Sequence, residues 1–380
     1  MNTECSPELP DYLAARQRED LRAVAMGVMA VTSVEHVPPL ERGTIRLTGK
    51  LHTDPEAAYA HLEQGFRNYG YTAMLQDDHP NVAVMALPGE FTAPNLRRWL
   101  PALMFVLTVI STVFVGGFQL DGFNWGEGLA FSAAILSILM AHEMGHFLVA
   151  RRRGVHVSYP YFIPMPLSPI GTMGAFIAMQ SPPRTRRDLL AVAIAGPVAG
   201  LVVAIPVLLL GLWLSPLKTL DPVAMQEQGM VLYMEGNSLL YILLKWIVSG
   251  RVLPDGLTDV MLHPVAFAGW VGILVTGLNL IPAGQLDGGH IFYTLFGRRI
   301  ARIVTYVLAG GLFLLGFQWM GWFLWSFLIL MFGQHRAPML NELAPLTSRE
   351  RWIALAGLVL FVLVFTPVPF VIIEPELLLP

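Results

Sequence analysis

Charged residues are scarce in this chain. Asp, Glu, Lys and Arg together make up 13% of its 380 residues, whereas apolar types make up 54%. A typical soluble domain is about 25% charged, because charged groups keep its surface hydrated. The composition therefore excludes an ordinary soluble protein and predicts a polytopic α-helical membrane protein that lies in a lipid bilayer.

Two further absences narrow the range of functions. The net charge is -3, so the chain lacks the basic field that attracts nucleic acid, and we expect no nucleic-acid partner. Cysteine occurs once, as Cys5, which excludes an internal disulfide and a cysteine-based metal site. The first 20 residues are polar and acidic and lack the basic and apolar regions of a secretory signal. We therefore expect a cytosolic amino terminus.

Most of the polar character lies in residues 1–96, which we interpret as a small soluble α+β domain. Residues 54–56 read Asp-Pro-Glu, which supplies an N-cap, a first-turn proline and an acidic first turn for a helix. Alternating apolar and polar side chains predict strands on either side of that helix, and a turn sequence joins the last two strands into a hairpin. The expected elements are a helix at 12–31, a strand at 43–51, a helix to Asn68, and strands at 71–76 and 81–87.

Residues 97–380 form the second predicted domain, which is embedded in the membrane. Several apolar stretches approach the roughly 20 residues that cross a bilayer core. Arginine clusters recur at the ends that this alternation places on one side, and the positive-inside rule makes that side cytosolic. We expect an integral multi-pass protein of a bacterial plasma membrane or an organellar membrane. Its six to seven membrane helices are expected at 99–118, 127–150, 188–214, 262–281, 302–333 (two helices) and 352–371.

Two segments of this domain do not fit a simple span. Residues 230–250 have a short apolar core interrupted by Glu235 and Lys245, which favours an interfacial or re-entrant helix. Residues 155–183 contain six prolines and an apolar run from Gly171 to Ile177, and this composition cannot form one helix. We expect a short β or re-entrant region there, near the cytosolic face.

His142, Glu143 and His146 form the pattern HExxH inside the second predicted span. Residues four apart share one face of a helix, so the two imidazoles can bind one metal ion while Glu143 lies beside its open side. Zinc is the expected ion, one per chain. Ionisable groups at membrane depth are costly and usually functional, which disfavours the alternative of two hydrogen-bonded core histidines.

A catalytic zinc site needs a third protein ligand. Val149 and Arg152 occupy positions where the metzincin pattern requires glycine and histidine, which excludes that continuation. Among the later carboxylates only Asp287 follows an apolar span closely, and its distance from the next basic cluster places it at a depth similar to that of His146. On spacing alone, a solvated residue in the turn sequence 284–289 is an equally good interpretation of this aspartate.

Residues 279–288 read N-L-I-P-A-G-Q-L-D-G. Together with HExxH, this segment resembles the NxxPxxxLDG motif of the site-2 proteases, which are intramembrane zinc metalloproteases. The resemblance covers most of the predicted membrane domain. It implies that His142, His146 and Asp287 bind zinc and that Glu143 is the general base. The implied reaction is hydrolysis of a peptide bond within or near a transmembrane segment of a membrane-anchored protein substrate, in regulated proteolysis.

The predicted amino-terminal domain also resembles the soluble domain of one subgroup, the plastid and cyanobacterial proteases related to the ethylene-dependent gravitropism-deficient yellow-green proteins. A substrate helix must unwind before cleavage, because its carbonyls are hydrogen-bonded internally. The strand edge predicted at Gly171–Ile177 would bind an unwound segment by β-augmentation. A hairpin that only packs on the second span is an equal alternative, and Asn279 is either a substrate contact or a routine helix-end residue. The candidate substrate-positioning residues are Asn279, Gly171, Thr172, Met173 and Gly174.

Two rival functions belong to other classes. A membrane metal-ion transporter would also place histidine and carboxylate groups in the membrane, but it predicts inverted repeats, and the sequence contains no second copy of these motifs. A non-proteolytic membrane scaffold would tolerate the loss of Glu143, which is present. Neither the oligomeric state nor the natural substrate follows from the sequence.

Overall fold

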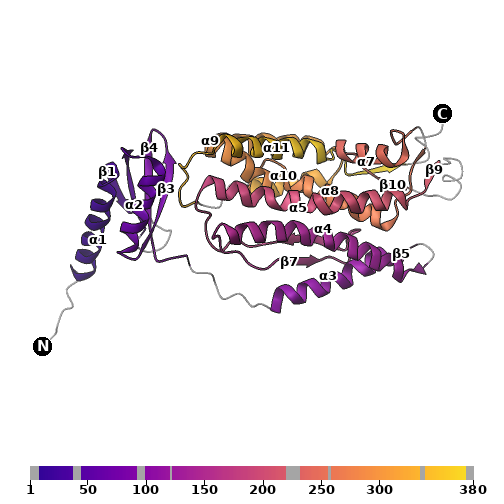
Figure 1. Ribbon diagram of the computed structural model, residues 1–380, viewed down its shortest axis with the longest axis horizontal. Helices are drawn as coiled ribbons and strands as arrows, with labels where there is room; N and C mark the ends of the chain where they lie inside the picture. The colour runs from indigo at the N-terminus through magenta and orange to yellow at the C-terminus, as the bar shows by residue number, and fades with distance from the viewer. Residues whose placement is uncertain are drawn as a thin grey trace.

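The structure, a computed structural model, separates a sheet-containing region from a bundle of helices. It describes residues 8–36, 44–91, 99–119, 122–219, 232–255, 258–333 and 339–373. Cys5 and the expected domain boundary at residue 96 lie outside these residues. Figure 1 shows the sheet at one end of an elongated molecule and the long helices side by side in the rest of it.

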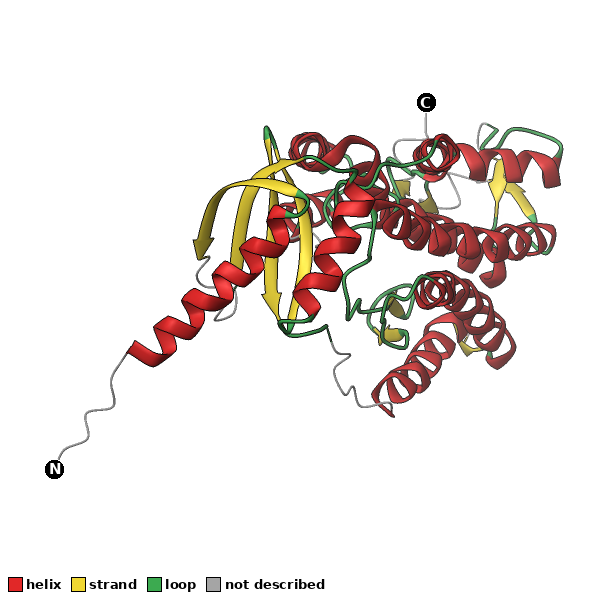
Figure 2. Cartoon of the chain, turned by 60° about the vertical axis from the view of Figure 1, so that its left-hand side comes forward, coloured by secondary structure: helices red, strands yellow, loops and turns green. Residues whose placement is uncertain are grey.

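The amino-terminal region is a four-stranded antiparallel sheet in the order β1-β2-β4-β3. Two helices cover one face of this sheet (Figure 2), and they enclose a separate hydrophobic core that includes Leu47, Leu62 and Leu75. The expected helix after Asp54 is present, and the Asp54 carboxylate accepts hydrogen bonds from the first backbone amides of that helix. The elements are α1 (Glu8–Met26), β1 (Met29–His36), β2 (Ile45–Leu51), α2 (Pro55–Arg67), β3 (Tyr71–Asp78) and β4 (Asn81–Pro88).

The helix expected at residues 12–31 is wrong at its carboxyl end. Helix α1 ends at Met26, and residues 29–36 pair with β2. Gly27 breaks the helix, and the sequence after it is rich in valine and threonine, which favour a strand. The apolar character of this stretch reflects its place in the sheet.

The rest of the chain is mainly helical. Figure 1 shows successive layers: α3, then α4, then α5 with α8, and finally α9 to α11. Among the described residues, α3, α4 and α5 are long and apolar enough to cross a membrane. The helices are α3 (Trp99–Gly117), α4 (Trp125–Arg152), α5 (Arg186–Trp213), α7 (Leu239–Ser249), α8 (Pro264–Asn279), α9 (Asp287–Leu315), α10 (Gly321–Phe332) and α11 (Ser348–Val364).

Helix α9 begins much earlier than expected. The predicted span started at residue 302, whereas the helix starts at Asp287 and is interrupted once, at Gly297. Gly297 has φ 75° and ψ 178°, a conformation that only glycine adopts readily, so α9 consists of two helical halves joined at a kink. Asp287 therefore occupies the start of a helix, and it is not a solvated turn residue.

Short strands form the remaining connections. The proline-rich segment contains the hairpin of β7 (Tyr161–Pro164) and β8 (Thr172–Phe176), as its composition predicted. Residues 230–250 contain a strand and the 11-residue helix α7. That helix is about 16 Å long, too short for a bilayer core of about 30 Å. The other pairs join β5 (Phe118–Gln119) to β6 (Gly122–Phe123), β9 (Leu217–Thr219) to β11 (Thr258–Val260), and β10 (Leu232–Glu235) to β12 (Phe370–Ile373).

Candidate metal centre

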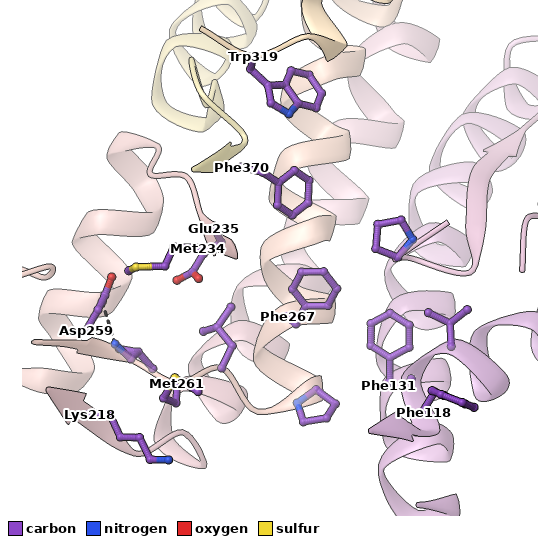
Figure 3. A pocket seen from close by; sticks show the side chains of 16 residues that line it. Phe118, Phe131, Lys218, Met234, Glu235, Asp259, Met261, Phe267, Trp319 and Phe370 are labelled. Carbon is purple, nitrogen blue, oxygen red and sulfur yellow. Dashed lines mark hydrogen bonds between the residues drawn. The ribbon is translucent and has the colours of Figure 1, made fainter. Parts of the chain in front are cut away.

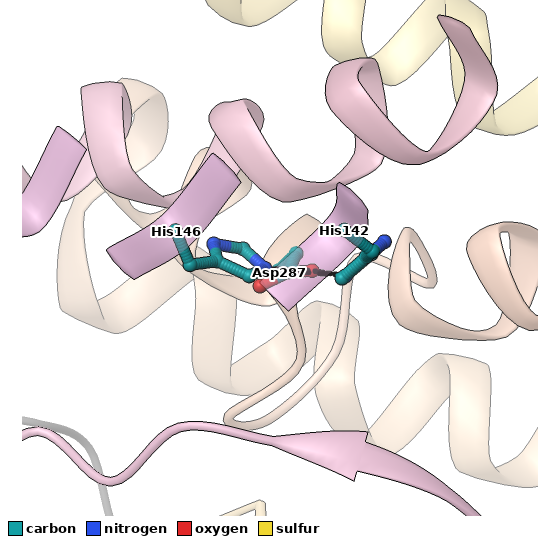
Figure 4. Close-up of side chains that lie close together, drawn as sticks. All are labelled: His142, His146 and Asp287. Atoms are coloured by element: carbon teal, nitrogen blue, oxygen red, sulfur yellow. Dashed lines mark hydrogen bonds and ion pairs between the residues drawn. The ribbon is translucent and has the colours of Figure 1, made fainter. Parts of the chain in front are cut away.

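Helix α4 places the two histidines of HExxH on one buried face. His142 and His146 are 4% and 7% exposed, and their ring centroids lie 4.9 Å apart. The side chains converge with Asp287, which comes from the start of α9 (Figure 4). The structure thus brings together the three ligands expected from the sequence.

The chain reaches Asp287 through a sharp reversal after α8. Gly284 has φ 59°, and a Cβ atom at Gly288 would lie 1.9 Å from the carbonyl oxygen of Leu280. Only glycine allows these close approaches of one backbone segment to another. The glycines on either side of Asp287 therefore fold its helix back onto the end of α8 and direct the carboxylate toward α4.

The geometry of the three donor atoms fits a zinc ion. The Nε2 atoms of His142 and His146 are 3.2 Å apart, and Asp287 Oδ2 lies 3.4 Å and 3.3 Å from them. Tetrahedral ligands at zinc bond lengths of about 2.0 Å are about 3.3 Å from one another. Two imidazoles and a carboxylate are also ligands that zinc prefers, and a zinc ion held by three protein ligands would have a fourth position for water or substrate.

The protonation pattern of His146 supports the same conclusion. Its Nδ1 atom lies 2.8 Å from the carbonyl oxygen of Val192 in α5. Because a carbonyl only accepts hydrogen bonds, Nδ1 carries the proton and donates it. A neutral ring that donates from Nδ1 has its lone pair on Nε2, which faces the shared point, and this is the form in which histidine binds a metal.

Two glycines of α5 make room for the imidazoles. A Cβ atom at Gly196 would lie 2.0 Å from His146 Nε2, and one at Gly200 would lie 3.1 Å from His142 Nδ1. These two glycines were not among the site residues predicted from the sequence. Their GxxxG spacing in an apolar helix was a visible signal, because this pattern lets membrane helices approach closely.

Glu143 shares a cavity of about 210 Å³ with the three candidate ligands. It is 5% exposed, and the backbone amide of Ile177, just beyond β8, donates a hydrogen bond to its carboxylate. Asn279 also lines the cavity, and its Nδ2 atom lies 3.3 Å from His142 Nε2. The expected base and the expected amide thus border the metal position.

The other candidate substrate-positioning residues lie farther along the hairpin. The carbonyl oxygen of Gly171 accepts a hydrogen bond from Ser111 of α3, and Thr172 donates to the carbonyl oxygen of Ile163. Met173 is 64% exposed. From this strand, Ala175 and the residues after it line the cavity, whereas residues 171–174 do not. The role of Gly171, Thr172, Met173 and Gly174 stays a prediction.

A second cavity, of about 770 Å³, lies away from this site (Figure 3). Its wall is mainly apolar and includes Phe131, Phe267 and Phe370, with Glu235 and Asp259 at one side. It contains none of the candidate metal ligands. Its acidic groups have partners within the chain, because Asp259 forms an ion pair with Lys245 and Glu235 accepts a hydrogen bond from Tyr241.

Comparison with known proteins gives one family match and several similar relatives. Residues 130–317 match the model of Peptidase family M50, and this range includes all three candidate ligands. The chain is 30% identical over 375 residues to the probable zinc metalloprotease EGY2, chloroplastic, of Arabidopsis thaliana, covering 90% of the chain and 62% of the relative. It is 30% identical over 246 residues to EGY1 of the same organism, which is likewise described as a probable zinc metalloprotease, covering 63% of the chain and 43% of the relative.

The same chain is 30% identical over 373 residues to a protein described as EGY2 in Oryza sativa subsp. indica, covering 90% of the chain and 64% of the relative. The chain thus spans less than two thirds of the length of these relatives. No solved structure matches it.

Proposed function

We propose that this chain is an intramembrane zinc metalloprotease of the M50 family, the site-2 proteases. Residues 130–317 match the model of Peptidase family M50, and the chain is similar to the EGY zinc metalloproteases. The observation that carries the proposal is the convergence of His142, His146 and Asp287 on one point with Glu143 beside it. None of the relatives reported above is named as a transporter or a scaffold.

The chemistry follows from the residues around that point. When bound, zinc polarises the scissile carbonyl and lowers the pKa of a water molecule at the open position. The imidazoles of His142 and His146 and the Asp287 carboxylate would hold the ion. The Glu143 carboxylate accepts a proton from the attacking water and delivers it to the departing amine nitrogen.

The substrate in this proposal is a locally unwound segment of a membrane-anchored protein. Among the described strands β8 pairs only with β7, so its second edge is unpaired, and the residues at its end line the cavity. A substrate strand on that edge would bring its backbone to the metal position. In this arrangement Asn279 orients the substrate, whereas residues 171–174 act indirectly, because they fix β8 against α3.

We also propose the topology expected from the sequence, with six to seven membrane helices and a cytosolic amino-terminal domain spanning residues 1–96. The separate hydrophobic core of the sheet region supports the division. Arg184, beside the basic start of α5, pairs with Glu63 of α2, so the sheet lies at the arginine-rich end of the bundle. The positive-inside rule assigns that end to the cytosol in a bacterial plasma membrane, or to the equivalent side of an organellar membrane.

The test of the activity uses the purified full chain in lipid and a membrane-anchored reporter helix. We expect Glu143→Gln to retain zinc and to lose at least about a hundredfold in cleavage rate, because a general base contributes about that much. His142→Ala is expected to lose both zinc and cleavage. Glu90→Gln, in an exposed position of the amino-terminal region, is the control and is expected to leave both unchanged. Cleavage at the wild-type rate by Glu143→Gln contradicts the proposed mechanism.

A further inference from the structure

A short segment between α10 and α11 joins parts of the protein that are distant in sequence. We call residues 339–343 the connector. Its backbone runs beside the edge strand β3: the amide of Leu75 donates to the carbonyl oxygen of Leu340 (2.8 Å), and the amide of Glu342 donates to the carbonyl oxygen of Leu75 (2.9 Å). The side chains of Leu340 and Leu343 pack against the core of the sheet. The connector is thus part of the amino-terminal fold.

The same segment is also fixed to the helical bundle. The amides of Leu340 and Asn341 donate to the carbonyl oxygens of Pro183 and Arg184, in the loop that leads into α5. Asn341 is 1% exposed, and its side-chain amide donates to the carbonyl oxygen of Pro55 at the start of α2. The connector therefore lies between the sheet region and the bundle and is hydrogen-bonded to both.

Glu342 extends this contact to α9. Its side chain is 2% exposed, and its carboxylate accepts hydrogen bonds from the Tyr293 hydroxyl (2.5 Å) and from Arg298 (2.9 Å). A buried carboxylate is costly without such partners. The contact with Tyr293 and Arg298 is therefore strongly preferred over a buried Glu342 that lacks them. The two donors lie on opposite sides of the kink at Gly297, and Glu342 therefore holds both halves of α9 in place.

The first half of α9 is a short rod between this contact and the metal centre. It runs from Asp287 to the kink, and Tyr293 lies about 9 Å from Asp287 along the helix axis. A helix of this length moves as a rigid body, so a shift or rotation at Tyr293 displaces the Asp287 carboxylate. A displacement of a few tenths of an ångström matters, because the donor atoms are already at ligand-to-ligand distances.

We propose that Glu342 is a positioning residue for the third metal ligand and that the docked amino-terminal domain sets its position through the connector. The inference rests on the proposed function. The docked domain holds the connector, Glu342 holds α9, and α9 holds Asp287 against the two histidines. Separation of the domain from the connector releases the first half of α9 and weakens zinc binding. The amino-terminal domain is then a regulator of the metal centre that acts through the first half of α9, in which Tyr293 lies about 9 Å from Asp287 along the axis.

The experiment measures zinc affinity of the purified full chain by competition with a chromophoric chelator. We expect Glu342→Ala to weaken zinc binding by about tenfold or more, as is usual for residues that support a metal ligand. Tyr293→Phe removes a single hydroxyl and is expected to weaken it less. Asn341→Ala loosens the connector from α2 while Glu342 and its partners remain, and it is expected to weaken zinc binding as well.

Glu35→Gln is the control. Glu35 is an exposed carboxylate on β1, the edge strand opposite β3, and its described contact, with Ser33, includes neither the connector nor α9. This variant is expected to bind zinc as the wild type does. Wild-type affinity in both Glu342→Ala and Tyr293→Phe overturns the inference. An effect of Glu342→Ala without any effect of Asn341→Ala overturns the role of the domain. A wild-type protein that binds no zinc contradicts the proposed function instead.

Discussion

Two buried polar clusters lie in the helical part of this protein, and the charged groups in them are arranged differently. In the cluster near the second cavity, Lys245 has a fully buried side chain that pairs with Asp259 at 3.3 Å and lies 4.7 Å from the centre of the Tyr241 ring. Glu235 accepts a hydrogen bond from Tyr241, and burial raises the pKa of Glu235 above its usual range. This cluster satisfies its own charges and hydrogen bonds.

The candidate metal centre is arranged differently. The Nε2 atoms of His142 and His146 and Oδ2 of Asp287 converge from two helices, and each lies 3.2 to 3.4 Å from the other two. The groups around Lys245 form separate pairs, and within the described part of the chain no three of their donor atoms converge on one point. The comparison teaches that the convergence of donor atoms at ligand-to-ligand distances, more than burial or charge, distinguishes a candidate metal site from a structural cluster.

Removal of one candidate metal ligand is expected to have the largest effect, which is the loss of stabilisation by zinc and of cleavage. At a zinc concentration about a hundredfold above the dissociation constant, zinc should stabilise the wild type by about 3 kcal/mol. His146→Ala is expected to abolish this stabilisation and the cleavage of the reporter helix. Thermal unfolding in detergent with and without zinc measures the effect. A zinc-dependent rise in the unfolding temperature of His146→Ala would show that the ion binds elsewhere.

The cluster around Lys245 and Asp259 is expected to affect the stability of the fold and to leave zinc binding unchanged. Lys245→Ala leaves the Asp259 carboxylate buried without its cation, which costs about 3 to 5 kcal/mol of stability, while zinc affinity of the folded fraction stays unchanged. The double variant Lys245→Met with Asp259→Leu removes both charges and is expected to recover most of that loss. Denaturation midpoints of the single and double variants measure the difference. Failure of the double variant to recover stability would mean that this cluster is also more than structural.

The sequence could predict which residues form the candidate metal centre, because its signals are local. His142 and His146 share a helix face by their spacing, and bilayer burial makes such groups functional. Asp287 was predicted by elimination and by its motif. Its place at the start of α9 was not predicted, because the sequence before and after Gly297 has the pattern of a turn followed by a membrane span. Glu342 had no local signal at all. Its partners are 44 and 49 residues away, and only the folded chain brings them together.

Substitution of the α5 glycines gives the smallest expected effect. It changes the space around the candidate ligands and leaves each of those side chains present. Gly196→Ala puts a methyl group 2.0 Å from His146 Nε2, so the ring or the helix must move, whereas the methyl group of Gly200→Ala lies 3.1 Å from His142 Nδ1 and needs only a small adjustment. We expect Gly196→Ala to weaken zinc binding by about tenfold or more and Gly200→Ala by less. Chelator competition ranks the two variants. Equal zinc affinities of the two variants would mean that α5 can move without cost. Close packing of α5 would then not be what holds the imidazoles at their ligand distances.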